Sequence, residues 1–355
     1  MIETSDLLVD KGALRLARFT HGVGDIGDGQ ALLRLDRFAL TSNNVTYAAL
    51  GEQFGYWKFF PAPAPNGRVP VWGFADVIES KCGEVAAGER IWGFYPIASH
   101  LAVTPTRVTP RGFVDGAKHR AGLPPVYNQY ERVAADPAYD QAREGHTALF
   151  RPLFVTGFLI EDFLHENALF GAKRVMLSSA SSKTAMGLAK CLKDRGGVEV
   201  IGLTAARNAE FVRKTGYCDR VVAYDRLGDL PNDAPTLLVD MAGDAPLINA
   251  LADRLGEAFV YNCMVGGTHW EAGVAETKGP PRVLFFAPDR IVKRHKDWGP
   301  EGFALRYAAA WEGFLGSTGR WLRVIEKSGE GPVREAWAAL LDGQARPEDG
   351  YVLRV

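Results

Sequence analysis

The sequence has 355 residues, a formal net charge of −1, 47% hydrophobic residues and 23% charged residues. This length fits two domains, and the composition excludes long disordered stretches. The charge balance gives no basic excess of the kind that nucleic acid or an anionic membrane requires. No apolar run approaches the roughly 20 residues that span a bilayer, and Met1–Asp10 is acidic and unlike a secretory signal. We therefore expect a cytoplasmic protein with no nucleic-acid or membrane partner.

The cysteines and histidines show none of the spacings that bind metal. Cys82, Cys191, Cys218 and Cys263 are far apart and form no C-x-x-C pair. Structural zinc needs clustered ligands, and disulfide scaffolds need denser cysteine. The histidines include no H-E-x-x-H motif. The sequence predicts reduced, mostly buried thiols and no metal site.

The first third of the chain predicts a small barrel-like β domain. Ala31–Leu40 alternates as a half-buried strand does, and Trp72–Ser80 and Glu89–Tyr95 are two further strands. Phe60–Pro70 is a proline-rich loop, because proline fixes φ and removes a backbone donor. Arg111–His146 has weak periodicity. It is either a long ordered loop with short helices or a partial lid.

From Phe150 onward, strands and helices alternate. Phe158–Leu169 is a predicted helix, and Thr184–Arg195 places alanines and leucines on one helical face. Six apolar strands are predicted, at Lys173–Ser178, Val198–Leu203, Arg220–Tyr224, Thr236–Asp240, Glu257–Cys263 and Arg282–Phe286. Such strands, separated by helices, predict an α/β fold with a doubly wound, six-stranded parallel sheet covered on both faces.

A strand, a tight turn of small residues and a helix follow one another between Val175 and Lys193. This arrangement aims backbone N–H groups and the helix dipole at an anion such as a pyrophosphate. The turn lacks the G-x-G-x-x-G motif, and Ser181–Thr184 stands there instead. Hydroxyl and ammonium groups also bind phosphate. The alternative is an ordinary strand–helix turn that Ser182 caps.

The second strand of this region ends at Leu203 and is followed by Thr204, Ala205, Ala206 and Arg207. An NAD site usually has an acidic residue here that holds the ribose 2′-hydroxyl. No Asp or Glu is present, and a hydroxyl with a guanidinium suits a 2′-phosphate instead. The sequence therefore favours NADP(H). The alternative is that Arg207 is a solvated surface residue.

The order of these pieces resembles the medium-chain dehydrogenase/reductase superfamily, especially its zinc-independent quinone oxidoreductase and enoyl reductase branch. The similar stretches span nearly the whole chain and include Thr41–Gly51, Val77–Phe94, Ser179–Ala185, Asp240–Gly243 and Cys263–Gly267. The resemblance implies a GroES-like β-barrel-type catalytic domain at 1–148 and 290–355, with an insertion near 111–146. It also implies a Rossmann dinucleotide-binding domain at 149–289.

The two motifs and the resemblance together give one set of cofactor-binding residues. They are Thr156, Ser179, Ala180, Ser181, Ser182, Lys183, Thr184, Thr204, Arg207, Tyr224, Cys263, Met264, Phe285 and Phe286. Thr156 and Gly157 resemble the pair that begins the helix before the cofactor domain. Asn44 matches the position where the branch often has an asparagine near the nicotinamide. Tyr47 is the candidate donor or acid, the alternative being a packed core tyrosine with a satisfied hydroxyl.

The chain also departs from the superfamily. The catalytic zinc ligands and the four-cysteine lobe are missing, the phosphate-loop glycines are replaced, and the insertion near 111–146 is longer. These departures indicate a divergent subfamily. The implied reaction is metal-independent hydride transfer from a nicotinamide to an activated double bond or carbonyl, as in an enone, quinone or enoyl thioester. Hydrogen-bond donors would stabilise the developing enolate or alkoxide.

Aromatic residues are dense beside Tyr47, at Phe54, Tyr56, Trp57, Phe59 and Phe60. They favour a small-molecule substrate that is large or hydrophobic, the alternative being a domain core or a subunit interface. The resemblance also implies a homodimer. The competing hypothesis for the whole chain is a degenerate member of the superfamily that binds cofactor weakly or not at all. Such a protein would serve in binding or as a scaffold.

Overall fold

The computed structural model describes residues 2–137, 139–265 and 276–355, and the chain divides into two compact units. Unit 1 combines the residues up to Leu149 with Val324–Val355, and unit 2 is Phe150–Arg323. The boundary expected at residue 290 therefore differs from the observed division, because 290–323 belong to unit 2. The cause is helix α6 (Ala287–Thr318), whose aromatic side chains pack on helix α2 (Glu144–Glu166).

Unit 1 is built mainly on antiparallel strands. Strands β3 (Ala31–Leu40), β5 (Pro70–Ser80) and β6 (Arg90–Pro96) lie side by side in its larger sheet. Among the described residues this sheet has the order β17-β18-β3-β5-β6-β10-β9-β8, and β7 also pairs with β3. The other strands are β7 (His100–Val103), β8 (Pro105–Thr109), β9 (Gly112–Asp115), β10 (Gln129–Arg132), β17 (Arg323–Ser328) and β18 (Asp349–Arg354).

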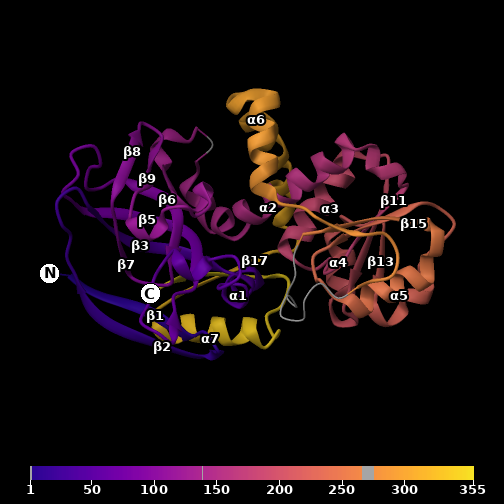
Figure 1. Cartoon of the computed structure of the whole chain (residues 1–355), viewed down its shortest axis with the longest axis horizontal. Coiled ribbons are helices and arrows are strands. Elements are labelled where there is room, and N and C mark those ends of the chain that lie inside the picture. The colour runs from indigo at the N-terminus through magenta and orange to yellow at the C-terminus, as the bar shows by residue number, and fades with distance from the viewer. Residues whose placement is uncertain (1, 138, 266–275) are drawn as a thin grey trace. The chain divides into compact units, whose positions relative to one another are not determined.

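A smaller sheet of unit 1 has the order β2-β1-β4. Its strands are β1 (Ile2–Asp10), β2 (Ala13–Gly24) and β4 (Asn66–Gly67). Helix α7 (Glu330–Leu341) lies along the β1–β2 hairpin (Figure 1), where buried Trp337 donates its indole N–H to the carbonyl of Leu14 at 2.9 Å. A short helix, α1 (Ser42–Ala49), follows β3.

The insertion at 111–146 consists of β9, β10 and short 3₁₀ turns. These turns are η2 (Lys118–Arg120), η3 (Pro125–Asn128), η4 (Val133–Ala135) and η5 (Gln141–Arg143). Arg120 and Asp115 are both almost fully buried and form an ion pair at 3.1 Å. The Arg120 guanidinium also lies 4.7 Å from the centre of the Phe60 ring. The ion pair lies within the insertion, and the contact with Phe60 joins the insertion to the rest of unit 1.

Unit 2 contains a parallel sheet that has six strands in the described part of the chain, which confirms the predicted doubly wound sheet. Its strands are β11 (Arg174–Leu177), β12 (Glu199–Thr204), β13 (Arg220–Ala223), β14 (Thr236–Asp240), β15 (Phe259–Met264) and β16 (Arg282–Leu284). The order is β13-β12-β11-β14-β15-β16. Because the direction of winding reverses between β11 and β14, the carboxyl ends of these two strands mark the switch point where such sheets bind ligands.

Helices α3 (Lys183–Arg195), α4 (Ala209–Thr215) and α5 (Ala245–Leu255) surround this sheet (Figure 1). Helix α2 begins at Glu144 rather than at the predicted Phe158, so Thr156 and Gly157 lie inside it. Pro152 is accommodated within the helix. Gly157 allows α2 to touch α3, since a Cβ there would lie 2.7 Å from the backbone nitrogen of Leu188.

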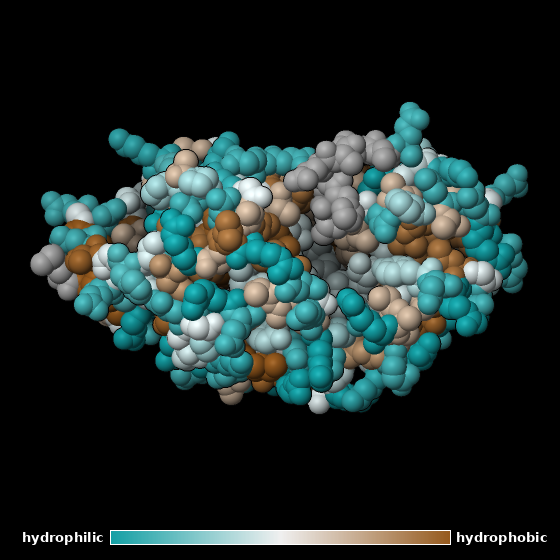
Figure 2. All heavy atoms as spheres, turned by 90° about the horizontal axis from the view of Figure 1, so that it is seen from below, coloured by the Kyte–Doolittle hydropathy of each residue, from teal (hydrophilic) through white to brown (hydrophobic). Residues whose placement is uncertain are grey.

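The exposed surface contains both hydrophobic and hydrophilic residues. On the face shown in Figure 2, hydrophobic residues form separate patches among hydrophilic ones. Exposed apolar side chains include Val283 and Leu284 on β16, and Val292 and Leu305 on α6. No helix among the described residues is long and apolar enough to cross a membrane.

Candidate functional site

The turn after β11 is a loop of small residues that ends in the cap of α3. Ser179 has a φ of 48°, a left-handed conformation that residues other than glycine rarely adopt. The hydroxyl of Ser182 accepts a hydrogen bond from the N–H of Ala185 at 3.2 Å. Lys183 and Thr184 are therefore the first two residues of α3, at the end where the helix dipole favours an anion.

The loop packs closely on β12. The N–H of Ala180 donates to the carbonyl of Leu203 at 2.9 Å. Gly202 permits this approach, because a Cβ there would lie 3.0 Å from the Cβ of Ala180. The N–H of Ser179 donates to the hydroxyl of Tyr224 at 2.7 Å, at the start of the 3₁₀ turn η8 (Tyr224–Asp229). Burial raises the pKa of Tyr224, so its hydroxyl remains neutral.

Ser181 connects the loop to the segment after β12. Its hydroxyl oxygen accepts hydrogen bonds from Oγ1 of Thr204 at 3.3 Å and from Nδ2 of Asn208 at 3.2 Å. A hydroxyl that accepts two hydrogen bonds still has its own proton to donate. Thr204 is buried, whereas Arg207 is exposed on the 3₁₀ turn η7 (Ala206–Asn208). Ser181, Thr204 and Asn208 thus lie close to one another in space at the ends of β11 and β12.

Ser178 and Asp240 connect the ends of β11 and β14 at the switch point. The Ser178 hydroxyl donates to Oδ1 of Asp240 at 2.9 Å and accepts from the N–H of Met241 at 2.7 Å. The same carboxylate oxygen accepts from the N–H groups of Ala242 and Gly243, each at 3.0 Å. Because both side chains are fully buried, this network fixes the turn that follows β14.

A second set of polar side chains lies on strands β14, β15 and β16, at Asp240, Asn262 and Arg282. Oδ2 of Asp240 is 3.6 Å from Nη2 of Arg282, too far for a hydrogen bond. Asn262 is fully buried, and neither its amide oxygen nor its amide nitrogen has a hydrogen-bond partner among the described residues. Asn262 pairs in register with Arg282, so the two side chains point to the same face of the sheet. Sequence patterns gave no indication of this polar group.

The ends of β15 and β16 are apolar. Cys263, Met264 and Phe285 are buried, whereas Phe286 is 46% exposed. The N–H of Phe285 donates to the carbonyl of Met264 at 2.8 Å. Burial raises the pKa of the Cys263 thiol to about 12, so the thiol is protonated and unreactive at neutral pH. The two glycines at 266–267, part of the stretch singled out in the sequence, lie outside the described residues.

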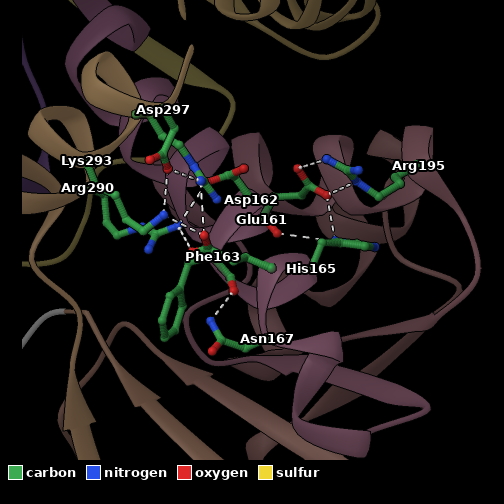
Figure 3. Close-up of polar contacts among 11 residues, drawn as sticks. Glu161, Asp162, Phe163, His165, Asn167, Arg195, Arg290, Lys293 and Asp297 are labelled. Atoms are coloured by element: carbon green, nitrogen blue, oxygen red, sulfur yellow. Dashed lines mark hydrogen bonds and ion pairs between the residues drawn. The ribbon is translucent and has the colours of Figure 1, made fainter. Parts of the chain in front are cut away.

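An ionic cluster holds α2 against the start of α6 (Figure 3). Arg294 is buried and donates to Glu166 at 3.0 Å and to Asp297 at 2.7 Å. Arg290 donates to Glu166 at 2.7 Å and to Asp162 at 3.1 Å. Chains of paired charges of this kind stabilise a fixed arrangement of the two helices.

This cluster lies next to one of the predicted cofactor residues. The guanidinium of Arg290 is 5.2 Å from the centre of the Phe163 ring, which is in turn 5.6 Å from the ring of Phe285. A hydrogen bond from Lys293, together with Arg290, lowers the pKa of Glu166 to about 2. The carboxylate is therefore ionised at neutral pH, and the cluster is structural rather than a source of protons.

Asn44 has a structural position in unit 1. Its Oδ1 accepts from the N–H of Thr41 at 2.7 Å, and its Nδ2 donates to the carbonyl of Pro70 at 2.9 Å. Thr41 and Asn44 form a capping box at the start of α1. Both ends of the buried amide thus bind this unit's own backbone. The assignment of Asn44 to the nicotinamide remains a prediction.

Tyr47 lies in an aromatic cluster of unit 1 and is only 6% exposed. The indole N–H of Trp72 donates to its hydroxyl at 3.4 Å, and its ring centre is 4.5 Å from that of Tyr56. The hydroxyl groups of Tyr56 and Tyr127 are 3.2 Å apart. Burial raises the pKa values of Tyr47, Tyr56 and Tyr127, so all three are neutral at physiological pH. We name these three residues the tyrosine cluster.

The other predicted aromatic residues have different positions. Trp57 is buried against Gly67, in the core of unit 1, so the core alternative applies to it. Phe59 and Phe60 are buried and pack on the tyrosine cluster, and Phe54 is 42% exposed. Thr156 is inside α2, where its hydroxyl donates to the carbonyl of Pro152 at 3.2 Å.

Asn208, Trp72 and Tyr127 belong to these polar sites but were not predicted as catalytic or cofactor-binding residues. Asn208 follows Arg207 directly, so its proximity to the candidate phosphate turn was the available signal. Trp72 and Tyr127 come from a strand and from the insertion, and only tertiary structure places them beside Tyr47. Within the described ranges, no three His, Cys, Asp or Glu side chains form a group that could hold a metal ion.

Solved structures with the same architecture define the class of fold. An enoyl thioester reductase mutant from Candida tropicalis superposes with a TM-score of 0.59 over 99% of this chain and 100% of that chain, at 11% identity. A quinone oxidoreductase from Coxiella burnetii gives 0.57 over 100% of both chains, at 14% identity. CurA from Vibrio vulnificus in complex with NADPH gives 0.58 over 94% and 93%, at 13% identity. The chain has the two-domain fold of the medium-chain dehydrogenase/reductase superfamily, which confirms the resemblance.

Comparison of the sequence with protein families places the chain in one particular family. The model of the family described as "Protein of unknown function (DUF2855)" matches residues 38–346, and the chain belongs to this family. No curated protein matches the sequence.

Proposed function

We propose that this chain is an NADP(H)-dependent reductase that transfers hydride, without a metal, to an activated double bond or carbonyl. The observation that carries the proposal is the position of Ser181, which accepts hydrogen bonds from Thr204 and Asn208 at the ends of β11 and β12. Dinucleotides bind at this edge of a doubly wound sheet. In support, two similar structures are named as a thioester reductase and a quinone oxidoreductase, and a third contains NADPH.

The groups after β12 suit a 2′-phosphate. Residues 204–208 contain no carboxylate that would bind the 2′-hydroxyl of NAD. Ser181 has a proton to donate, Asn208 has a second amide N–H, and Arg207 on the same turn carries a guanidinium. Phosphate oxygens only accept hydrogen bonds, so a set of donors is the appropriate chemistry for them.

The loop before α3 would hold the pyrophosphate. The amino-terminal end of α3 presents partial positive charge there, and Lys183 is its first residue. Ser179 adopts the left-handed φ that glycine usually supplies in such loops. The close packing of Ala180 against Gly202 keeps the loop near the sheet. The loop therefore fits a dinucleotide even though its glycines are replaced.

Tyr47 is the proposed hydrogen-bond donor to the substrate. When bound, NADPH would supply the hydride for the electrophilic carbon of the substrate. The electron pair of the reduced bond then moves toward the carbonyl oxygen. Because the indole N–H of Trp72 can only donate, the oxygen of Tyr47 accepts from it and its own proton remains for that substrate oxygen. Tyr47 would give its proton to that oxygen and regain one from solvent, so the substrate would gain one hydride and one proton.

The substrate class follows from the neutral, aromatic character of this site. Tyr47, Tyr56 and Trp72 offer hydroxyl and indole groups within an apolar cluster. Such a lining suits a neutral, hydrophobic carbonyl compound, namely an enone, a quinone or an enoyl thioester.

Binding of the two nicotinamide cofactors tests the proposal. Titration with NADPH and NADH, followed by nicotinamide fluorescence, should give tight binding of NADPH and weak binding of NADH. Arg207→Ala should weaken NADPH binding by about tenfold or more and leave NADH binding nearly unchanged. Arg213→Ala is the matched control, because Arg213 is an exposed arginine on the next helix that pairs with Glu210.

Three outcomes would contradict parts of the proposal. If neither cofactor binds, the chain is better described as a degenerate member of the superfamily that serves as a binding or scaffold protein. If Lys183→Ala leaves the affinity for both cofactors unchanged, Lys183 does not contact the pyrophosphate. If Arg207→Ala keeps the preference for NADPH, the 2′-phosphate assignment is wrong.

A further inference from the structure

The insertion at 111–146 contributes a side chain to the tyrosine cluster. Tyr127 lies on η3, and its hydroxyl is 3.2 Å from the hydroxyl of Tyr56. Its ring meets the ring of Tyr47 nearly edge-on, with centres 6.4 Å apart and planes at 84°. It also packs 4.8 Å from Phe94, which contacts Tyr47 from β6. Tyr127 therefore contacts Tyr47 directly by its ring and indirectly through Tyr56.

The donors and acceptors of the tyrosine cluster restrict the orientation of its hydroxyl groups. Trp72 donates to Tyr47, so the oxygen of Tyr47 is an acceptor on that side. Tyr56 and Tyr127 each have one proton and accepting lone pairs, so a hydrogen bond between them restricts the rotation of both hydroxyls. The ring of Tyr56 is packed 4.5 Å from that of Tyr47. Fixing Tyr56 therefore also limits the positions open to Tyr47.

We infer that Tyr127 is a positioning residue, which holds Tyr56 and Tyr47 in the arrangement that polarises the substrate carbonyl. The inference rests on the proposed reductase function. It gives the insertion a role, because the segment completes the substrate side of unit 1 with a residue that the strands alone do not supply. Tyr127 acts through the other two tyrosines and is not itself the proton donor.

The test compares two tyrosines of the insertion. Tyr127→Phe removes the hydroxyl that contacts Tyr56 and keeps the ring, and Tyr127→Ala removes both. Tyr130→Phe is the matched control. The hydroxyl of Tyr130 donates to the carbonyl of Phe94 at 2.7 Å and accepts from buried Arg120, so its role is in packing. The readouts are kcat and KM for NADPH-dependent reduction of enones, quinones and enoyl thioesters, Kd for NADPH, and Tm.

Tyr127→Phe should lower kcat about threefold to tenfold, with KM within about twofold of the wild type and Kd for NADPH unchanged. Tyr127→Ala should lower kcat further, because the ring contact with Tyr47 is also lost. Tyr130→Phe should lower Tm and leave kcat unchanged. A wild-type kcat in Tyr127→Phe would overturn the inference. So would equal losses of kcat and Tm in Tyr127→Phe and Tyr130→Phe.

A measurement without substrate separates this inference from the reductase proposal. Fluorine NMR of the full chain labelled with 3-fluorotyrosine reports the environment of each tyrosine, with signals assigned from single Tyr→Phe variants. Tyr127→Phe should shift and broaden the signals of Tyr47 and Tyr56, whereas Tyr130→Phe should leave them in place. Unmoved signals in Tyr127→Phe would overturn the positioning role. Shifted signals in a protein that reduces none of the substrates would support the positioning and contradict the reductase function.

Discussion

The hydroxyl of Ser178 donates a 2.9 Å hydrogen bond to the carboxylate of Asp240, and both residues are fully buried. These residues are 62 positions apart in the sequence. Ser178 directly follows β11 and Asp240 ends β14, and these two strands are neighbours in the sheet. The bond therefore fixes the relative position of two turns at the switch point of unit 2. The proposed cofactor loop is one of these turns.

Ser178→Ala should destabilise unit 2. The substitution removes the hydroxyl that donates to the Asp240 carboxylate, and it leaves the N–H of Met241 without its side-chain acceptor. The expected loss is about 1–3 kcal/mol in the free energy of unfolding, measured by urea denaturation. Thr156→Ala is the control, since this half-exposed hydroxyl donates to the carbonyl of Pro152 within the same helix, and it should cost about 0.5 kcal/mol or less. Equal stability of Ser178→Ala and wild type would show that the network contributes nothing.

Asn262→Leu should stabilise the protein. Both polar atoms of this buried amide lack a hydrogen-bond partner among the described residues, and leucine has a similar volume without those atoms. The free energy of unfolding should rise by about 1 kcal/mol or more. Asn66→Leu is a matched control with the opposite sign, because the buried amide of Asn66 donates to the carbonyl of Pro63 at 3.1 Å. Loss of stability in both variants would mean that Asn262 is satisfied in solution.

Stability should depend on pH through Glu166. Its pKa is lowered from 4.5 to about 2 in the folded chain by Lys293 and Arg290. A carboxyl group with a depressed folded pKa stabilises the protein above its unfolded pKa, and this contribution is lost as pH falls toward the folded pKa. The loss should therefore fall between about pH 4.5 and pH 2. Glu166→Gln should flatten the curve of unfolding free energy against pH in this window, whereas exposed Glu257→Gln should not.

We propose that the chain forms a homodimer through strand β16. In the described part of the sheet, β16 is the last strand and pairs only with β15. Its side chains Val283 and Leu284 are 42% and 52% exposed, and an apolar edge strand favours pairing with a second copy. Light scattering after gel filtration should give the dimer mass for wild type and the monomer mass for Leu284→Lys. A monomeric wild type at tens of micromolar would refute the proposal.

The sequence was most informative about unit 2. Buried parallel strands are short apolar runs, and helices such as α3 carry an apolar face. The pattern within each segment is therefore sufficient to predict the type of element. The β1–β2 hairpin was not predicted, because its strands are largely half-exposed and carry charged residues. Helix α1 has a weak local signal and depends on its capping box with Thr41.

The polar sites could be predicted only in part. Ser181 was found because it lies in a turn between a strand and a helix, which is a local feature. Its contact with Asn208 depends on how β11 and β12 pair, and no local pattern encodes that contact. The position of Tyr127 beside Tyr56 is even less predictable, because it depends on how the insertion packs through Arg120 on Phe60.

The discontinuous sheet of unit 1 has a consequence for the order of events during translation. Strand β3 pairs with β18, so Leu40 is opposite Tyr351, a residue near the other end of the printed sequence. The ribosome completes all of unit 2 before it makes β18. Unit 2 can therefore fold while unit 1 still lacks strands of its sheet, and the edge of β3 that β18 covers stays open to incorrect pairing until β18 emerges.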